Sequence, residues 1–239
     1  MGRVISFASG KGGVGKTLLV ANLGTAAAQL GRKIVIVDAD IPMANLGLML
    51  GLETKKATLH EVLAGEAKIS QAIYAGPEGV KVVPSGMTLN GLRKIKPGLM
   101  EETINQLAKR AEIVLIDGPS GLGRDALTAL RVSKEVIIVT TPDIASLSDA
   151  LKTKIVAEHL NVKPTGAVIT RAMGKKIDIP QEKIEALLEL PILGIIPEDP
   201  ETRRSVALGK PVVTYKPKSE GAKVFKELAK KLFGGKKKR

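Results

Sequence analysis

The sequence predicts an α/β fold built on a doubly wound, mostly parallel sheet. Three observations carry this prediction: short β-branched apolar runs recur along the 239 residues, helical stretches separate them, and polar motifs follow directly after several of the runs. Runs that are apolar throughout are typical of parallel strands with helices on both faces. Ligands of such sheets bind at the carboxyl ends of the strands, so the motifs fall where a binding site is expected.

The individual elements follow from this alternation in chain order. Strands are predicted at residues 4–8, 33–37, 80–83, 113–116, 136–140, 167–169 and 192–196. Helices fit between them, for example at residues 17–29, 100–110, 127–132, 147–159, 182–188 and 202–208. The first strand runs into a glycine-rich loop, the second into Asp38 and Asp40, and the fourth into Asp117. His60 and His159 are expected on solvated helix surfaces and are given no role.

Composition limits the class of protein. A chain of 239 residues is long enough for one large α/β domain and too short for two of ordinary size. No apolar run reaches the roughly 18 to 20 residues that a bilayer crossing needs. The first strand begins within a few residues of Met1 without the pattern of a signal peptide, so a cytoplasmic protein is expected. The absence of cysteine excludes disulfides, zinc ribbons and iron–sulfur ligation.

Positive charge is concentrated at the carboxyl-terminal end. Residues 201–239 hold 13 of the 37 Lys and Arg but 3 of the 24 Asp and Glu, so they account for +10 of the formal net charge of +13. The rest of the chain is nearly neutral. Such a tail is expected to attract a polyanion, either a membrane surface or a nucleic acid.

A phosphate-binding loop is indicated by SFASGKGGVGKTLL, residues 6–19, which follows a predicted strand and opens a predicted helix. That context favours a nucleotide site over a chance match in a glycine-rich turn. Glycines allow backbone N–H groups to converge on a phosphate, and the helix adds the positive end of its dipole. Lys16 is expected to bridge the β- and γ-phosphates and the Thr17 hydroxyl to ligate Mg²⁺. The expected nucleotide contacts from this loop are Gly12, Gly13, Val14, Gly15, Lys16, Thr17 and Leu18.

A second lysine, Lys11, directly follows the first glycine of the loop. The loop already satisfies the phosphates bound to its own subunit. Lys11 is therefore either a solvated surface lysine or a group that reaches a different nucleotide.

The string GKGGVGKT resembles the deviant phosphate loop of the MinD/ParA family of ATPases. VDADIPMANLGLMLGL resembles the first switch of that family, with Asp38, Asp40 and Asn45, and IVLIDGPSG its Walker B strand and second switch, with Asp117. The resemblance implies a P-loop NTPase of SIMIBI-type architecture that binds ATP or ADP with Mg²⁺. It also implies an ATP-dependent homodimer in which Lys11 reaches the nucleotide of the partner.

Three carboxylates are expected near the phosphates. Asp117 ends a buried apolar strand, where an unpaired carboxylate costs several kcal/mol, so a metal-bound role is favoured over a structural one. Asp38 and Asp40 follow the second strand two residues apart, so one can hold a Mg²⁺-bound water while the other meets the attacking water. The resemblance assigns the water-positioning role to Asp40, and the alternative is an aspartate that caps a turn. The expected catalytic residues are Lys11, Lys16 and Asp40, and the expected metal ligands are Thr17, Asp38 and Asp117.

Two positions depart from the family pattern and bear on nucleotide binding. Leu18 stands where the family usually has a second threonine, which removes a hydroxyl near the α-phosphate. Thr170 stands where relatives usually carry an asparagine that reads adenine, and it can supply only part of that contact. The base is therefore expected to be held by Arg171, Pro197, Glu198 and Asp199.

The last residues form a predicted amphipathic helix with a basic tail. We divide the chain into an ATPase domain at 1–218 and this segment at 219–239. Apolar residues recur at helical spacing and lysines flank them: Val224, Phe225, Leu228, Ala229, Leu232 and Phe233, with Lys223, Lys226, Lys230 and Lys231. Residues 222–239 can lie in an anionic lipid headgroup region, dock on the domain with solvated lysines, or contact DNA phosphates. A helix whose first half docks while Leu232, Phe233 and the lysines reach lipid would combine the first two alternatives.

The expected function is a slow Mg²⁺-dependent ATPase that switches dimerisation and membrane association. TLHEVLAGE, IIPEDP and LAKKLFGG resemble the cell-division branch of the family and imply a peripheral protein at the inner face of the cell membrane. An unidentified partner protein would stimulate hydrolysis. The alternatives are a ParA-like segregation ATPase that binds DNA nonspecifically, and a nucleotide-binding scaffold with little turnover.

Overall fold

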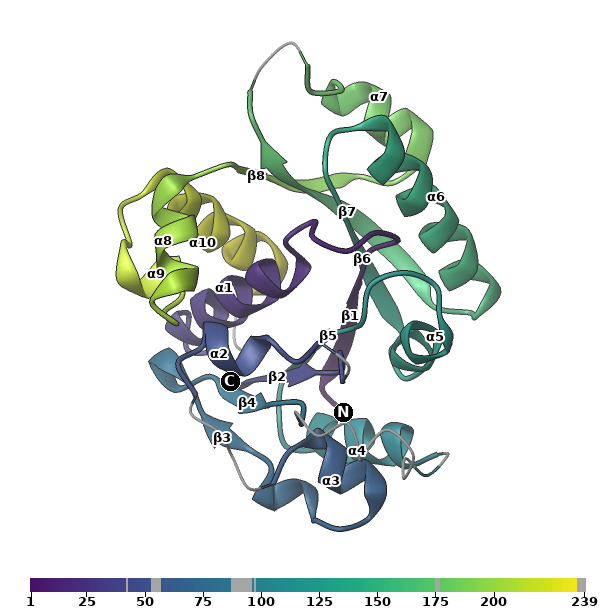
Figure 1. Cartoon of the computed structure of the whole chain (residues 1–239), viewed down its shortest axis with the longest axis vertical. Helices are drawn as coiled ribbons and strands as arrows, with labels where there is room; N and C mark the ends of the chain where they lie inside the picture. The colour runs from purple at the N-terminus through teal and green to yellow at the C-terminus, as the bar shows by residue number, and fades with distance from the viewer. Residues whose placement is uncertain (42, 53–56, 87–95, 97, 175–176, 236–239) are drawn as a thin grey trace.

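A computed structural model describes residues 1–41, 43–52, 57–86, 96, 98–174 and 177–235 (Figure 1). Its centre is an eight-stranded sheet in the order β3-β4-β2-β5-β1-β6-β7-β8. The strands are β1 (Arg3–Ala8), β2 (Ile34–Asp38), β3 (Tyr74–Ala75), β4 (Lys81–Val83), β5 (Ile113–Asp117), β6 (Glu135–Thr140), β7 (Lys163–Ala172) and β8 (Ile192–Pro197). Every neighbouring pair is parallel except β3 and β4. The predicted doubly wound, mostly parallel sheet is confirmed.

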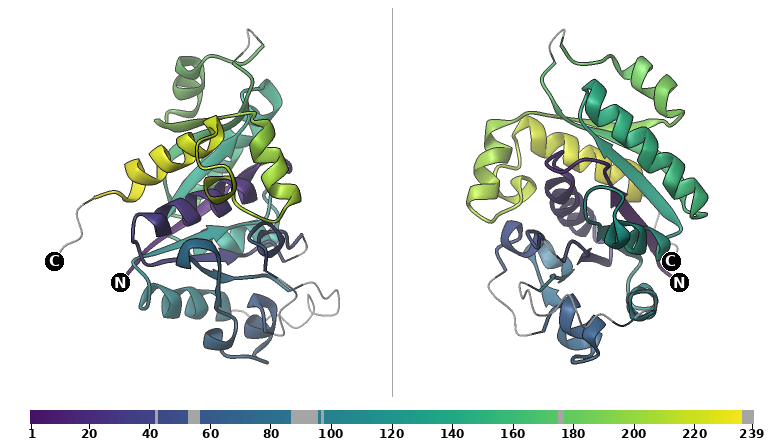
Figure 2. Two further views of the ribbon diagram at one scale, coloured as in Figure 1. Left: turned by 90° about the vertical axis from the view of Figure 1, so that its left-hand side faces the viewer. Right: turned by 45° about the vertical axis from the view of Figure 1, so that its right-hand side comes forward.

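Helices cover both faces of this sheet (Figures 1 and 2). They are α1 (Lys16–Gln29), α2 (Leu46–Met49), α3 (Leu59–Ala64), α4 (Leu99–Ala108), α5 (Arg124–Arg131), α6 (Ile144–His159), α7 (Gln181–Leu188), α8 (Pro200–Ala207), α9 (Val212–Tyr215) and α10 (Glu220–Phe233). Because side chains alternate along a strand, Ile36 belongs to the core cluster beneath α1 and α10 on one face, while Val35 and Val37 belong to the cluster of α3 and α4 on the other. This two-sided burial explains why the central strands are apolar throughout.

The observed elements differ from the predicted ones mainly at their ends. All seven predicted strands are present, but β7 extends well beyond 167–169 on both sides, and the two-residue β3 gave no sequence signal. The helix predicted at 147–159 starts at Ile144, because the Asp143 side chain accepts a hydrogen bond of 3.0 Å from the N–H of Ser146 and caps it. His60, predicted on a solvated surface, is 3% exposed. It belongs to α3, a helix too short for its apolar periodicity to be recognised.

Helix α10 is part of the main core. It packs against α1 and β8, and its apolar stripe is buried there: Ala222, Phe225, Leu228, Ala229 and Phe233. Its last turn is tied to the domain by Arg3, whose guanidinium donates to the carbonyl of Leu232 at 3.3 Å. Phe233 is 2% exposed, so this structure has the docked alternative for the tail helix, while Val224 and Leu232 of the predicted stripe are partly buried. The terminal basic residues 236–239 lie outside the described residues.

Candidate functional site: a phosphate loop and its pocket

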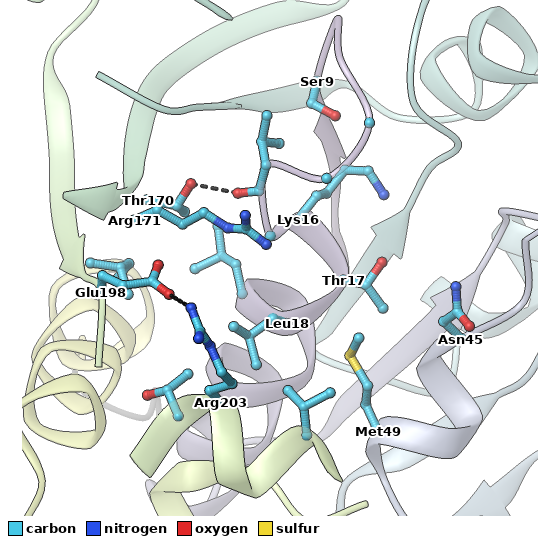
Figure 3. A pocket seen from close by; sticks show the side chains of 18 of the residues that line it. Ser9, Lys16, Thr17, Leu18, Asn45, Met49, Thr170, Arg171, Glu198 and Arg203 are labelled. Carbon is cyan, nitrogen blue, oxygen red and sulfur yellow. Dashed lines mark hydrogen bonds and ion pairs between the residues drawn. The ribbon is translucent and has the colours of Figure 1, made fainter. Parts of the chain in front are cut away.

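A cavity of about 460 Å³ opens at the carboxyl ends of the central strands (Figure 3). Its lining joins all of the predicted nucleotide contacts with several residues that were not predicted: Ser9, Gly12, Gly13, Val14, Gly15, Lys16, Thr17, Leu18, Leu19, Asp40, Met43, Asn45, Met49, Ser120, Thr170, Arg171, Ile196, Pro197, Glu198, Asp199, Thr202, Arg203, Val206 and Phe225. One end is formed by the loop between β1 and α1. The other is formed by the segment after β8 together with α8.

The loop has the backbone that the glycines predict. Gly13 and Gly15 have φ of 80° and 84°, in the left-handed region that disfavours side chains. Gly15 caps α1, and its carbonyl accepts the first helical hydrogen bond from Leu19 at 2.9 Å. A side chain at Gly10 would clash with the carbonyl oxygen of Asp149, so the loop is pressed against α6. The amino end of α1 therefore faces the cavity, as an anion site requires.

The Lys16 ammonium makes an ion pair inside the site. Its Nζ lies 2.6 Å from Asp117 Oδ1, and the two side chains are 6% and 0% exposed. The second oxygen, Asp117 Oδ2, is buried without a hydrogen-bond partner in the described part of the chain. A nucleotide phosphate would compete with Asp117 for Lys16, and that exchange would leave the carboxylate in need of another cation.

Asp38 and Asp40 are held differently. Both Asp38 oxygens accept backbone N–H groups, from Asp40 at 3.1 Å and Leu46 at 3.2 Å, and its Cα is paired with that of Asp117 across β2 and β5. Burial, with the charge of Asp117 second, raises the pKa of the Asp38 carboxyl well above its ordinary value. Asp40 is half-buried at the cavity wall, and burial raises its pKa against the attraction of Lys16. Asp38 is thus fixed at the sheet edge. Asp40 lines the cavity, and its Oδ1 accepts the N–H of Met43 at 3.2 Å, which is the turn-capping contact named above as the alternative.

The residues present fit a bound Mg²⁺. Asp117 offers a buried carboxylate oxygen without a partner among the described residues, Thr17 lines the cavity, and Asp38 lies on the strand next to Asp117. Hard oxygen ligands of this kind suit Mg²⁺, which usually takes one or two carboxylate contacts and shares the rest with phosphate and water. When bound, the ion would neutralise charge that develops on the phosphates.

Lys11 lies outside this pocket. It is exposed and lines a second hollow of about 470 Å³, together with Gly12, Pro142, Asp143, Arg171 and Met173. Lys16 points inward from the same loop. The two lysines therefore line different hollows of the protein.

The base end of the cavity shows where the Thr170 hydroxyl is engaged. Thr170 is 4% exposed, and its hydroxyl lies 2.5 Å from the carbonyl of Val14 and 3.1 Å from that of Thr140, so its proton is donated to the backbone and the side chain holds the phosphate loop. The next residue, Arg171, has φ of 53° at an irregularity in the β7–β8 pairing, a backbone that aims its side chain at the cavity (Figure 3). Glu198 forms an ion pair of 2.7 Å with Arg203.

The Asp199 carboxylate is held by three hydrogen bonds at the base end of the pocket. Its Oδ1 accepts from the N–H of Glu201 at 3.0 Å, and its Oδ2 accepts from Thr202 Oγ1 at 2.9 Å and from the N–H of Gly221 at 3.2 Å. These bonds occupy the carboxylate, which caps α8 at the edge of the cavity.

Several lining residues were not predicted. Ser9 follows β1 directly, and its hydroxyl is buried without a partner among the described residues, next to the loop. Its position after a strand is a signal that could have identified it. Arg203, Val206 and Phe225 carry no such signal, because only the packing of α8 and α10 brings them to the cavity.

Comparison with known proteins places this fold and site in context. The model of the ParA family, described as NUBPL iron-transfer P-loop NTPases, matches residues 1–233. The chain is 44% identical to an uncharacterised ATP-binding protein of Methanocaldococcus jannaschii, over 99% of this chain and 89% of that protein.

Two solved structures are similar over nearly the whole chain. The cell division ATPase MinD of Pyrococcus furiosus superposes with a TM-score of 0.93 at 42% identity, covering 97% of this chain and 98% of that one. The septum site-determining protein MinD of Pyrococcus horikoshii, complexed with Mg-ADP, gives a TM-score of 0.93 at 40% identity, covering 97% and 96%.

Proposed function

This chain belongs to the ParA family of P-loop NTPases, and from that premise we propose that it is a MinD-like ATPase. Mg-ATP drives it to dimerise and to associate with membrane in the placement of division sites or proteins. The similar protein of P. horikoshii was solved with Mg-ADP, which supports the same ligand here. Iron transfer, which the family description names, does not suit this chain, since its 239 residues hold no cysteine.

The observation that carries the proposal is the separation of the two lysines. Lys16 is buried within the pocket, where it can serve the nucleotide of its own subunit. Lys11 is exposed on the outer side of the loop, where a second copy of the chain could bring its own phosphates. Phosphoryl transfer needs positioning and charge neutralisation more than a strong base. Asp40, which faces the cavity, would position water. Lys11 would add its positive charge to the phosphates bound by the partner subunit, and so would act only in the dimer. Slow turnover by the isolated chain follows.

The test is a pair of alanine variants in the same loop. Lys16→Ala is expected to abolish ATP binding, whereas Lys11→Ala is expected to retain it and to lose ATP-dependent dimerisation and turnover. Calorimetry measures binding, and light scattering with and without ATP measures the oligomer. Equal loss of ATP binding in both variants would contradict the role across the dimer.

Membrane association is proposed to be electrostatic. No helix within the described ranges is long and apolar enough to cross a bilayer. The apolar stripe of α10 is buried, while Lys223 and Lys230 on the same helix are exposed. An anionic surface attracts each nearby lysine by about 1 kcal/mol, so one helix binds weakly and a dimer presents two. The protein would thus be cytoplasmic and peripheral at the inner face of the membrane, with ATP controlling its location.

Sedimentation with anionic vesicles tests this part. Neutralising two lysines per subunit, Lys223→Gln with Lys230→Gln, removes four charges from the dimer and should weaken ATP-dependent binding by about 4 kcal/mol, or about 10³-fold. Lys81→Gln with Lys109→Gln changes two exposed lysines on other elements, β4 and the residue after α4, and is the matched control. If the intact protein with ATP does not sediment with vesicles at low salt but shifts duplex DNA, the membrane hypothesis is wrong and the segregation ATPase is the better interpretation.

A further inference from the structure

Helix α10 supports the wall at the base end of the nucleotide pocket. Phe225 lies at the cavity, although it is 1% exposed, so its ring packs behind the surface that a ligand would touch. Phe233, further along the helix, is 2% exposed in the same core cluster and is not among the residues at the cavity. The two phenylalanines are thus alike in burial and differ in their distance from the pocket.

One carboxylate ties this helix to the pocket. Asp199 follows β8 at the cavity wall and caps α8 through the N–H of Glu201 and the hydroxyl of Thr202. Asp199 Oδ2, the oxygen that accepts the Thr202 hydroxyl, also accepts the N–H of Gly221, in the first turn of α10, at 3.2 Å. The segment after β8, α8 and α10 are therefore joined by hydrogen bonds to one carboxylate, that of Asp199.

The contact between α10 and this centre is close. A side chain at Gly221 would lie 2.5 Å from Thr202 Oγ1 and 2.6 Å from Asp199 Oδ2, so the helix can approach this near only with glycine there. A small displacement of α10 would therefore move the cap of α8 and the loop that it holds. The cavity residues Arg203 and Val206 lie on α8 and would move with it.

We propose that docking of α10 and binding of the nucleoside part of the nucleotide are thermodynamically coupled. Docking fixes the base end of the pocket, and a bound nucleoside in turn stabilises the docked helix, because a ligand favours whichever state it binds better. Asp199, Gly221 and Phe225 are positioning residues for this end. The proposal rests on the nucleotide site proposed above. Pyrophosphate would fill only the phosphate end of the pocket, so its binding should not depend on the docking of α10.

Calorimetry of the full chain with Mg-ADP and Mg-pyrophosphate tests the coupling. Phe225→Leu is expected to weaken ADP binding at least about fivefold and to leave pyrophosphate binding unchanged. The matched variant Phe233→Leu, which also shortens a buried ring of α10, is expected to leave both affinities unchanged. Equal loss of ADP affinity in both variants, or unchanged ADP affinity in Phe225→Leu, overturns the coupling. If the unmodified chain binds neither ligand, the nucleotide site itself is wrong.

Hydrogen exchange on the unmodified chain gives a test that needs no variant. Mg-ADP should slow amide exchange in residues 221–228 of α10, and Mg-pyrophosphate should slow it in the phosphate loop without reaching α10. Equal slowing of α10 by both ligands, or none by ADP, overturns the proposal.

Discussion

The two ends of the pocket are built in different ways. The phosphate end is built mainly on one continuous segment, in which the loop from Ser9 to Leu18 carries its own turn, donors and lysine, with Asp117 and Thr170 in contact with it. The base end is assembled from β7, the residues after β8, α8 and α10, which are far apart in the chain. The phosphate end thus depends on local backbone geometry and the base end on helix packing. Substitutions should therefore act on different ligands at the two ends.

The largest effect is expected at Lys16, which belongs entirely to the phosphate end. Lys16→Ala should lower the free energy of unfolding by about 3 to 5 kcal/mol, because Asp117 is left buried and unpaired. Urea unfolding measures this loss. Lys16→Ala combined with Asp117→Asn should regain most of the stability and none of the nucleotide binding. A double variant as unstable as the single one would show that the ion pair is unimportant.

Asp40 tests catalysis apart from binding. Asp40→Ala should slow ATP hydrolysis about 10²- to 10⁴-fold if its carboxylate positions the attacking water. ATP affinity should change little, since the expected phosphate contacts come from the loop. Single-turnover hydrolysis and calorimetry, carried out on the same preparation, separate the two quantities. Hydrolysis at the parental rate would exclude Asp40 from the reaction.

Thr170 distinguishes the two ends most directly. Its hydroxyl is engaged with the loop carbonyl of Val14, so Thr170→Val should cost about 1 kcal/mol, or about fivefold, in affinity for ADP and for pyrophosphate alike. The variant is close in shape, and its melting temperature reports any general loss of stability. A loss confined to ADP would mean that Thr170 contacts the base.

The smallest effect is expected at the rim of the base end. The ion pair between Arg203 and Glu198 joins side chains that are 80% and 36% exposed, and such pairs contribute about 0.2 to 1 kcal/mol. Arg203→Ala should therefore weaken ADP binding less than about fivefold and leave pyrophosphate binding unchanged. A larger loss for ADP would make Arg203 a direct ligand of the nucleotide.

The sheet, the phosphate loop and the positions of the carboxylates could be predicted from the sequence alone. These features depend on short-range rules: apolar runs form buried strands, glycines permit positive φ, and polar residues after parallel strands meet at one edge. Lys16, Asp38 and Asp117 could therefore be placed together from their positions in the chain alone. The MinD/ParA family was recognised from the same local strings.

The partner of each polar group and the exposed surface of the tail helix depend on long-range packing. The alternation of Phe225, Leu228 and Phe233 predicts an amphipathic helix, but periodicity does not say whether lipid or protein covers the apolar side. Packing against α1 and β8 settles this for α10. The hydroxyl of Thr170 is directed to Val14, 156 residues away in the chain, because β7 passes beside the phosphate loop. Contacts over such distances depend on how whole elements pack, which no local pattern encodes.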